Sequence, residues 1–197
     1  MTAVTLPTTP SVRVADPMLI DFGSDMVPIL GGPVQRVNRM GSRYSLTVEL
    51  PPVKEEPNAR IWASALRQAK QLGAIFTVPQ PGLTIGSPGT PLVNGAHTGG
   101  TSLSIKGLSS TYALKQGQFL SIIHSSRRYL YAVAADATAS GGNVTVTLET
   151  MLRTALANND VIEIATPKIE GYLDGDPAVK MMLEPYRTVS FRIVERE

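Results

Sequence analysis

Residues 43–50 read RYSLTVEL, a strict alternation of polar and apolar side chains. The apolar members are Tyr44, Leu46, Val48 and Leu50. Because successive side chains of a β-strand point to opposite faces, this alternation is typical of a strand with one buried face. We therefore predict a half-buried strand here, with Tyr44 as one of the core residues.

A helix is predicted directly downstream, over residues 59–72. This segment contains neither Gly nor Pro, and its apolar residues recur at the spacing of one helical face. The apolar stripe comprises Ile61, Trp62, Ala65, Leu66, Ala69 and Leu72. Gly73 is placed to end the helix, and the apolar residues 74–78 predict a strand after it.

Trp62 is the only tryptophan of the chain, and it could be either a stacking platform for a sugar or base or a core anchor. Its place on the apolar stripe favours the core. We expect the helix to pack through Ile61, Trp62, Leu66 and Leu72. The sheet that receives the helix is expected to contain Tyr44, Leu46, Val48 and Phe191.

Residues 83–167 differ in composition from both flanks, because they are rich in Gly, Ser and Thr. They lie between Pro79-Gln-Pro-Gly82 and Pro167, and they contain five short strand-like runs separated by turn residues. These runs are residues 101–105, 118–123, 129–134, 143–148 and 161–164. Short strands at this spacing are typical of a small barrel or sandwich.

The last alternating run is residues 188–194, in which Val189, Phe191 and Ile193 are the apolar members. The simplest topology places this run in one sheet with residues 43–50. Residues 1–82 and 168–197 then form a discontinuous main domain, and residues 83–167 are an insertion. The predicted fold class is mainly β (α+β), with a β-sandwich or barrel-like main domain, one packed helix and an inserted small β-barrel.

The N-terminal residues 1–15 are rich in Pro and Thr and predict an extended arm. Such an arm gains order by lying on another surface, and the sheet edge of a neighbouring subunit is one such support. We therefore expect the arm to cross to an adjacent subunit or tail protein, rather than fold back on its own domain, with Val4, Leu6, Val12 and Val14 as its buried contacts. Residues 18–30 predict one short strand at most, because turn residues flank them on both sides.

Composition excludes several classes of function. The 197 residues include no cysteine, which rules out disulfides, thiolate nucleophiles and Cys-based zinc or iron–sulfur sites. A net charge of +2 is too weak for a nucleic-acid footprint, so we expect no specific nucleic-acid partner. No apolar run is long enough to span a bilayer, and the N-terminus lacks the basic and apolar regions of a signal peptide.

The sequence shows no clear constellation of catalytic or metal-ligating residues. His97 lies in a Gly-rich loop and His124 ends a predicted strand, without the spacing of a two-His metal site. Asp174-Gly-Asp176 lacks the closing Glu of a calcium loop, and Glu55-Glu56 suits a helix N-terminus. We therefore predict no catalytic residue, cofactor or bound metal, although spacing alone leaves a Ser–His–Asp triad open.

Several stretches, in order along the chain, resemble the distal tail proteins, or tail-tip baseplate proteins, of phages with long, non-contractile tails. They are RYSLTVELPP (43–52), ARIWASAL (59–66), GSPGTPLVNGAHTGGTSL (86–103), LKQGQFLSI (114–122) and VSFRIVE (189–195). The resemblance runs over roughly residues 40–197 and consists of turn, packing and strand residues. Relatives carry Gly-Asp where this chain has Gly117-Gln118, so no role for that acid carries over.

The resemblance implies a virion protein, made in the host cytoplasm, that forms a ring of six expected copies beneath the tail tube. The ring would connect the tube to the hub and fibres, with the inserted domain projecting outward. A competing interpretation is a carbohydrate- or receptor-binding module of a tail tip, with a host-surface glycan as its partner. That interpretation needs exposed aromatic side chains in the insertion. Tyr129 and Tyr131 share one face of a predicted strand there. They form either part of the core, which we favour, or a platform on which a glycan stacks. A cell-wall hydrolase is the weakest interpretation, because the usual catalytic and zinc signals are absent from the sequence.

Overall fold

The alternating segment forms β5 (Arg43–Glu49) within a six-stranded sheet of the computed structural model, which describes residues 3–179 and 186–196. The strand order is β1 (Val4–Thr5), β7 (Ala74–Thr77), β16 (Lys168–Val179), β18 (Val189–Glu195), β5 and β2 (Val14–Ile20). Neighbouring strands are antiparallel except for β1 and β7. Phe191 pairs with Val48, so the two alternating segments lie side by side as predicted.

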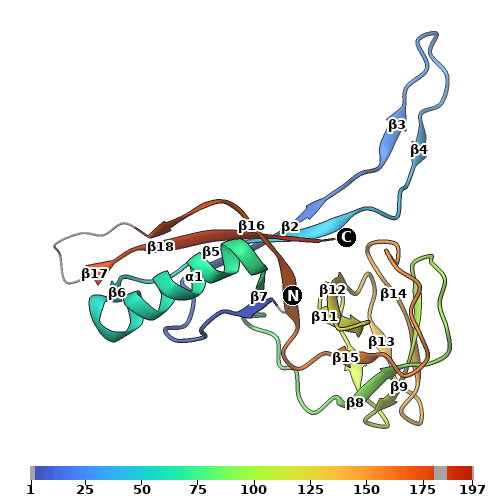
Figure 1. Ribbon diagram of the computed structural model, residues 1–197. Coiled ribbons are helices and arrows are strands. Elements are labelled where there is room, and N and C mark those ends of the chain that lie inside the picture. The colour runs from blue at the N-terminus through green and yellow to red at the C-terminus, as the bar shows by residue number, and fades with distance from the viewer. Residues whose placement is uncertain (1–2, 180–185, 197) are drawn as a thin grey trace.

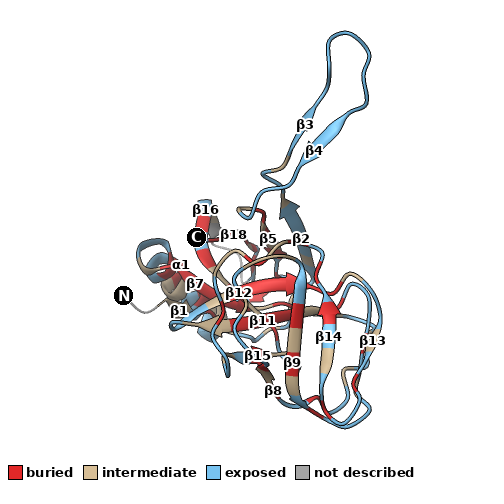
Figure 2. Cartoon of the chain, turned by 90° about the vertical axis from the view of Figure 1, so that its right-hand side faces the viewer, coloured by how far each residue is buried: buried red, intermediate tan, exposed pale blue. Residues whose placement is uncertain are grey.

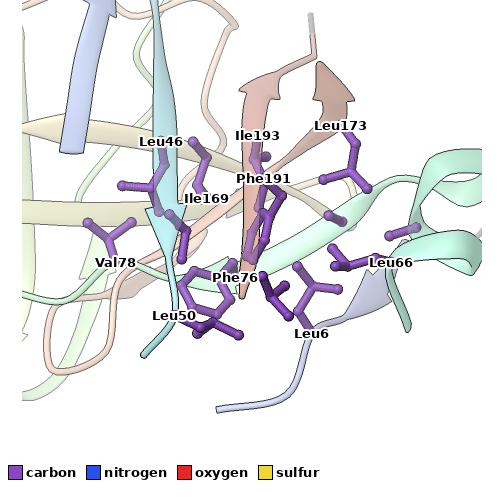
Figure 3. Packing of buried hydrophobic residues seen from close by; sticks show 14 of the residues in the cluster. Leu6, Leu46, Leu50, Leu66, Phe76, Val78, Ile169, Leu173, Phe191 and Ile193 are labelled. Atoms are coloured by element: carbon purple, nitrogen blue, oxygen red, sulfur yellow. The ribbon is translucent and has the colours of Figure 1, made fainter. Parts of the chain in front are cut away.

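The described part of the chain contains one α-helix, α1 (Arg60–Leu72), which covers one face of this sheet (Figure 1). The helix is preceded by β6 (Val53–Lys54), which pairs with β17 (Tyr186–Arg187), and by the irregular helical turn η1 (Glu55–Ala59). Figure 3 shows Leu66, Phe76 and Phe191 among the side chains between helix and sheet. The four expected core anchors, Tyr44, Trp62, Leu66 and Phe191, all lie in this core. The fold is therefore mainly β (α+β), as predicted.

The helix presents a narrower face to the sheet than the apolar stripe predicts. Trp62 is completely buried, and its ring centroid lies 5.8 Å from that of Phe191. Ile61 is 45% exposed and Leu72 is only partly buried. The expectation that Ile61 packs on the sheet is wrong, because Trp62 occupies the centre of the buried face and consecutive residues lie about 100° apart around a helix.

The inserted segment builds a second six-stranded sheet. Its strand order is β12 (Arg127–Ala132), β11 (Phe119–His124), β15 (Val161–Glu163), β8 (Gly89–Val93), β9 (Ser102–Leu108) and β14 (Val144–Thr147). The outer strands of this sheet meet at a bridge between Val133 and Leu148, so the sheet curls into a partial barrel around its own hydrophobic cluster. All five predicted strands are present. The additional strand β8 is not evident from the sequence because Gly89 and Pro91 interrupt its pattern.

The short strands β10 (Ala113–Leu114) and β13 (Ala137–Thr138) pair beside this barrel. The insertion leaves and re-enters the main sheet at one point. Thr77, the last residue of β7, pairs with Lys168, the first residue of β16, and the Val78 amide donates to the Pro167 carbonyl at 2.8 Å. β7 and β16 are therefore neighbours in the main sheet, although the insertion separates them in the sequence.

Residues 21–42 project from the body as a long hairpin whose strands are β3 (Ser24–Met26) and β4 (Gln35–Val37) (Figure 1). Figure 2 shows this hairpin exposed along most of its length, in contrast to the buried strands of the two sheets. The expectation of one short strand at most in residues 18–30 is wrong, since they hold the end of β2 and all of β3. A strand exposed on both faces needs no alternation, and Pro17 is tolerated because β2 is an edge strand.

The N-terminal arm folds back onto its own domain. The Val4 amide donates to the Gly73 carbonyl at 2.9 Å, and Leu6 is only 2% exposed within the core of the main sheet. Val4 and Val12 pack, partly buried, against the same core, whereas Val14 is exposed on β2. The expectation that this arm crosses to a neighbouring subunit is therefore wrong, because its own domain already covers three of the four proposed contacts.

Candidate functional site

The hairpin of residues 21–42 carries the most exposed large apolar side chains of the described chain. Ile29 and Leu30, at its tip, are 101% and 99% exposed. Further exposed apolar residues along the hairpin are Phe22, Met26, Val27, Val34, Val37 and Met40. A cluster of exposed apolar side chains of this size marks an interaction surface.

Polar contacts hold the stem of the hairpin. Asp21 Oδ1 accepts hydrogen bonds from the Gly23 amide and the Ser42 hydroxyl, both at 2.8 Å. Arg36 forms ion pairs with Asp21 and Asp25. The Gly23 amide and the Ser42 hydroxyl lower the pKa of Asp21, so its carboxylate stays charged for these contacts. The stem is thus fixed by its own residues, and the apolar tip is presented to solvent.

A buried ionic cluster joins the inserted domain to the main sheet. Glu195, at the end of β18, is completely buried. Its carboxylate accepts hydrogen bonds from the amides of Tyr44 at 2.8 Å and Leu130 at 2.7 Å, and from Nη2 of Arg153 at 2.6 Å. Burial raises the pKa of Glu195 against the opposing effects of Arg153 and the two amides. Tyr44 belongs to the main sheet, whereas Leu130 and Arg153 belong to the insertion. The Glu195 carboxylate therefore connects the insertion to the main sheet.

Aromatic rings enclose Arg153 in this cluster. Its guanidinium carbon lies 5.3 Å from the ring centroid of Tyr129 and 5.6 Å from that of Tyr131. Burial lowers the pKa of Arg153, but Glu195 and Tyr131 outweigh burial, so the guanidinium stays charged. Both tyrosines are buried in the core of the insertion, which confirms the core interpretation and gives no support to a glycan platform at these rings.

A second polar cluster links strands of the insertion to β16. Glu163 accepts hydrogen bonds from Ser121 Oγ at 2.8 Å, Arg128 Nε at 3.1 Å and Lys168 Nζ at 2.8 Å. Glu170 accepts a hydrogen bond from the Arg128 amide at 3.1 Å. Partial burial raises the pKa of Glu163, but the hydrogen bonds from Lys168, Ser121 and Arg128 outweigh it, so the pKa lies below its usual 4.5. These bonds fasten the insertion to the main sheet at the point where the chain returns to it.

Both histidines make hydrogen bonds that support loops. Nε2 of His97 accepts a hydrogen bond from the Ser104 amide at 3.3 Å. Nδ1 of His124 lies 2.7 Å from Oδ2 of Asp160, which also accepts a hydrogen bond from the Ala157 amide at 2.7 Å. Asp160 therefore orients the imidazole and the loop before β15 at the same time.

The acidic residues that the sequence singles out lie in separate ion pairs. Asp174 Oδ2 lies 3.4 Å from Arg192 Nη1, Glu56 Oε1 lies 2.5 Å from Arg60 Nε, and Glu55 pairs with Arg187. Across residues 3–179 and 186–196, no group of three or more His, Asp or Glu side chains is arranged to hold a metal ion.

The sequence pattern identifies the core anchors but neither the hairpin nor the buried ion pair. The signal available for the hairpin tip is the apolar run MVPIL (26–30), followed at once by Gly31-Gly32-Pro33. Pro28, in the middle of this run, has no amide to donate and so disfavours a paired central strand. Apolar residues at a turn therefore point to contact with another surface.

No model of a known protein family and no curated protein sequence matches this chain. Within the described residues, no helix has both the length and the apolar character needed to cross a membrane. The hairpin tip, with Ile29 and Leu30 fully exposed, is the candidate functional surface.

Proposed function

We propose that this chain is a structural subunit of a phage tail tip, a distal tail protein that forms a ring between the tail tube and the hub and fibres. The observation that carries the proposal is the braced hairpin with Ile29 and Leu30 fully exposed. Exposing large aliphatic side chains to water costs free energy that contact with another molecule recovers. The resemblance of residues 40–197 to distal tail proteins names the assembly in which such contact would occur.

The asymmetry of the subunit supports a ring. The hairpin extends from one end of β2, which is the outermost strand of the main sheet (Figure 1). A contact between this hairpin and a different surface of the next copy runs head to tail, and head-to-tail contacts close into rings when the rotation allows it. The expected number of six copies comes from the resemblance.

The two interdomain clusters support a connecting role. A subunit that joins a tube to fibres must keep its domains together under force. Parting Glu195 from Arg153 would leave a buried charge uncompensated, which is strongly unfavourable. The proposed partners are further copies of the chain and the tail tube, hub and fibre proteins, and the proposed location is the tail tip of the virion after synthesis in the host cytoplasm.

Negative-stain electron microscopy of the purified full chain tests this proposal. We expect closed rings of uniform diameter. Monodisperse monomers that bind glycans would instead favour a carbohydrate-binding module and contradict the ring.

A further inference from the structure

A mostly apolar groove of about 330 Å³ lies where β2 meets the inserted domain. It is lined by Ala15, Pro17, Pro79, Pro81, Leu83 and Phe119, together with Gln80, Gln116, Gly117 and Gln118. Within this lining, the Gln80 side chain accepts a hydrogen bond from the Phe119 amide at 2.7 Å and donates one to the Phe119 carbonyl at 3.4 Å. These two bonds fix the linker against β11, so the groove is formed before anything binds to it, which lowers the cost of binding.

The hairpin of the same chain does not reach this groove. Pro17 lies in β2, and the hairpin continues from the end of that strand away from both sheets (Figures 1 and 2). The contacts of Asp21 with Gly23, Ser42 and Arg36 hold the two strands of the stem together. The tip therefore lies away from the groove of its own copy and is open to contact with another molecule (Figures 1 and 2).

The tip and the groove match in chemistry and in size. The tip sequence PILGGP (28–33) carries no charge, and Gly31, at a φ of +77°, allows the tight turn there. An apolar cavity of about 150 Å³ accommodates benzene. A groove of about 330 Å³ can therefore take the side chains of Ile29 and Leu30 together.

We propose that Ile29 and Leu30 of one copy occupy this groove on a second copy of the chain, an inference that rests on the proposed ring. Each copy then has one donor tip and one acceptor groove on different parts of its surface. Such a contact is head to tail, so it leaves a free tip and a free groove after every addition until the ring closes. The groove is thus the partner surface of the hairpin.

Disulfide cross-linking tests the contact directly, because the chain contains no cysteine of its own. One copy carries Ile29→Cys and a mass tag, and a second, untagged copy carries Leu83→Cys. The two copies are mixed and oxidised mildly. The control replaces Leu83→Cys by Gln71→Cys, on the exposed side of α1. The tag separates the mixed product from tip-to-tip products on a denaturing gel.

We expect a mixed product with Leu83→Cys and none with Gln71→Cys. If light scattering shows assembly but the mixed product is missing, this docking is wrong while the ring proposal survives. If the unmodified chain stays monomeric at every concentration, the ring proposal fails as well.

Complementary variants give a second readout. Ile29→Ser with Leu30→Ser removes the donor tip, and Leu83→Asp places a charge in the acceptor groove. We expect each variant alone to stay monomeric and their mixture to stop at the dimer, because only one productive contact remains. The loss of two buried aliphatic side chains should raise the dissociation constant by roughly 100-fold or more. Growth of the mixture beyond the dimer would contradict the assigned pairing.

Discussion

Glu195 and Arg153 form an ion pair across the boundary between the two domains, with Nη2 of Arg153 donating to the Glu195 carboxylate at 2.6 Å. Both side chains are almost completely buried. Glu195 ends the last strand of the main sheet, whereas Arg153 follows β14 in the insertion. One buried carboxylate, at the very end of β18, therefore helps to hold the inserted domain in position.

Replacing Glu195 by Ala should lower the free energy of unfolding by about 3–5 kcal/mol, because it leaves the Arg153 charge buried without its partner. The control is Glu56→Ala, which breaks the exposed pair with Arg60 and should change stability little. Urea unfolding of both variants measures the difference. Equal losses in the two variants would show that the buried pair does not hold the domains together.

Replacing Trp62 by Ala should cost about 3–5 kcal/mol of unfolding free energy. The substitution empties a fully buried site beside Phe191 and removes the hydrogen bond that Trp62 Nε1 donates to the Thr9 carbonyl at 2.9 Å. The neighbouring Ile61→Ala, on the exposed side of the helix, should cost far less. Denaturant unfolding of this matched pair checks the orientation of α1, which would be wrong if Ile61→Ala were the more damaging change.

These core positions also show how far sequence reasoning reaches. When one face of a strand or helix is buried, its apolar residues recur at a regular spacing in the sequence. β5, β18 and α1 could therefore be predicted from alternation and helical spacing. The hairpin sequence shows no such regular spacing of apolar residues, because both faces of the hairpin are exposed to water. Leu6 was predicted as an anchor of the arm, but on a neighbouring surface, because the β7 backbone that orders it lies far along the chain. The burial of Glu195 could not be predicted, since nothing local in the sequence reveals the Arg153 that pairs with it.

Acid should weaken the fold through Glu163, whose pKa lies below its usual 4.5 because hydrogen bonds from Lys168, Ser121 and Arg128 outweigh burial. At a pH between the pKa values of the folded and the unfolded state, this carboxylate is ionised in the folded protein and protonated in the unfolded chain. The stabilisation is therefore fully present above about pH 4.5 and is lost as the pH falls through the folded-state pKa.

Glu163→Gln should flatten the acid side of the stability profile, measured by urea unfolding from about pH 3 to about pH 6, a window that brackets the usual pKa of 4.5 for this side chain. Glu195, whose burial raises its pKa, acts with the opposite sign and is common to both proteins, so it cancels in the comparison. An identical acid slope in the variant and the unmodified chain would refute the assignment to Glu163.

Residues 83–167 expressed alone should fold, because they enclose a hydrophobic cluster of their own. We expect a β-type circular dichroism spectrum and a cooperative thermal transition. Its midpoint should lie below that of the insertion in the full chain, since Arg153 loses Glu195 on excision. A coil spectrum without any transition would show that the main sheet is needed for this domain to fold.

Light scattering over a range of protein concentrations tests whether the exposed tip of the hairpin drives self-assembly. The comparison is between the unmodified chain, the double variant Ile29→Ser with Leu30→Ser, and the control Val161→Ser, which removes an exposed apolar side chain from the insertion instead. We predict that the unmodified chain and the control assemble to masses well above 21.1 kDa, whereas the double variant keeps the thermal stability of the parent but stays at 21.1 kDa. Assembly of the double variant to the same mass as the unmodified chain would show that the tip does not drive self-assembly.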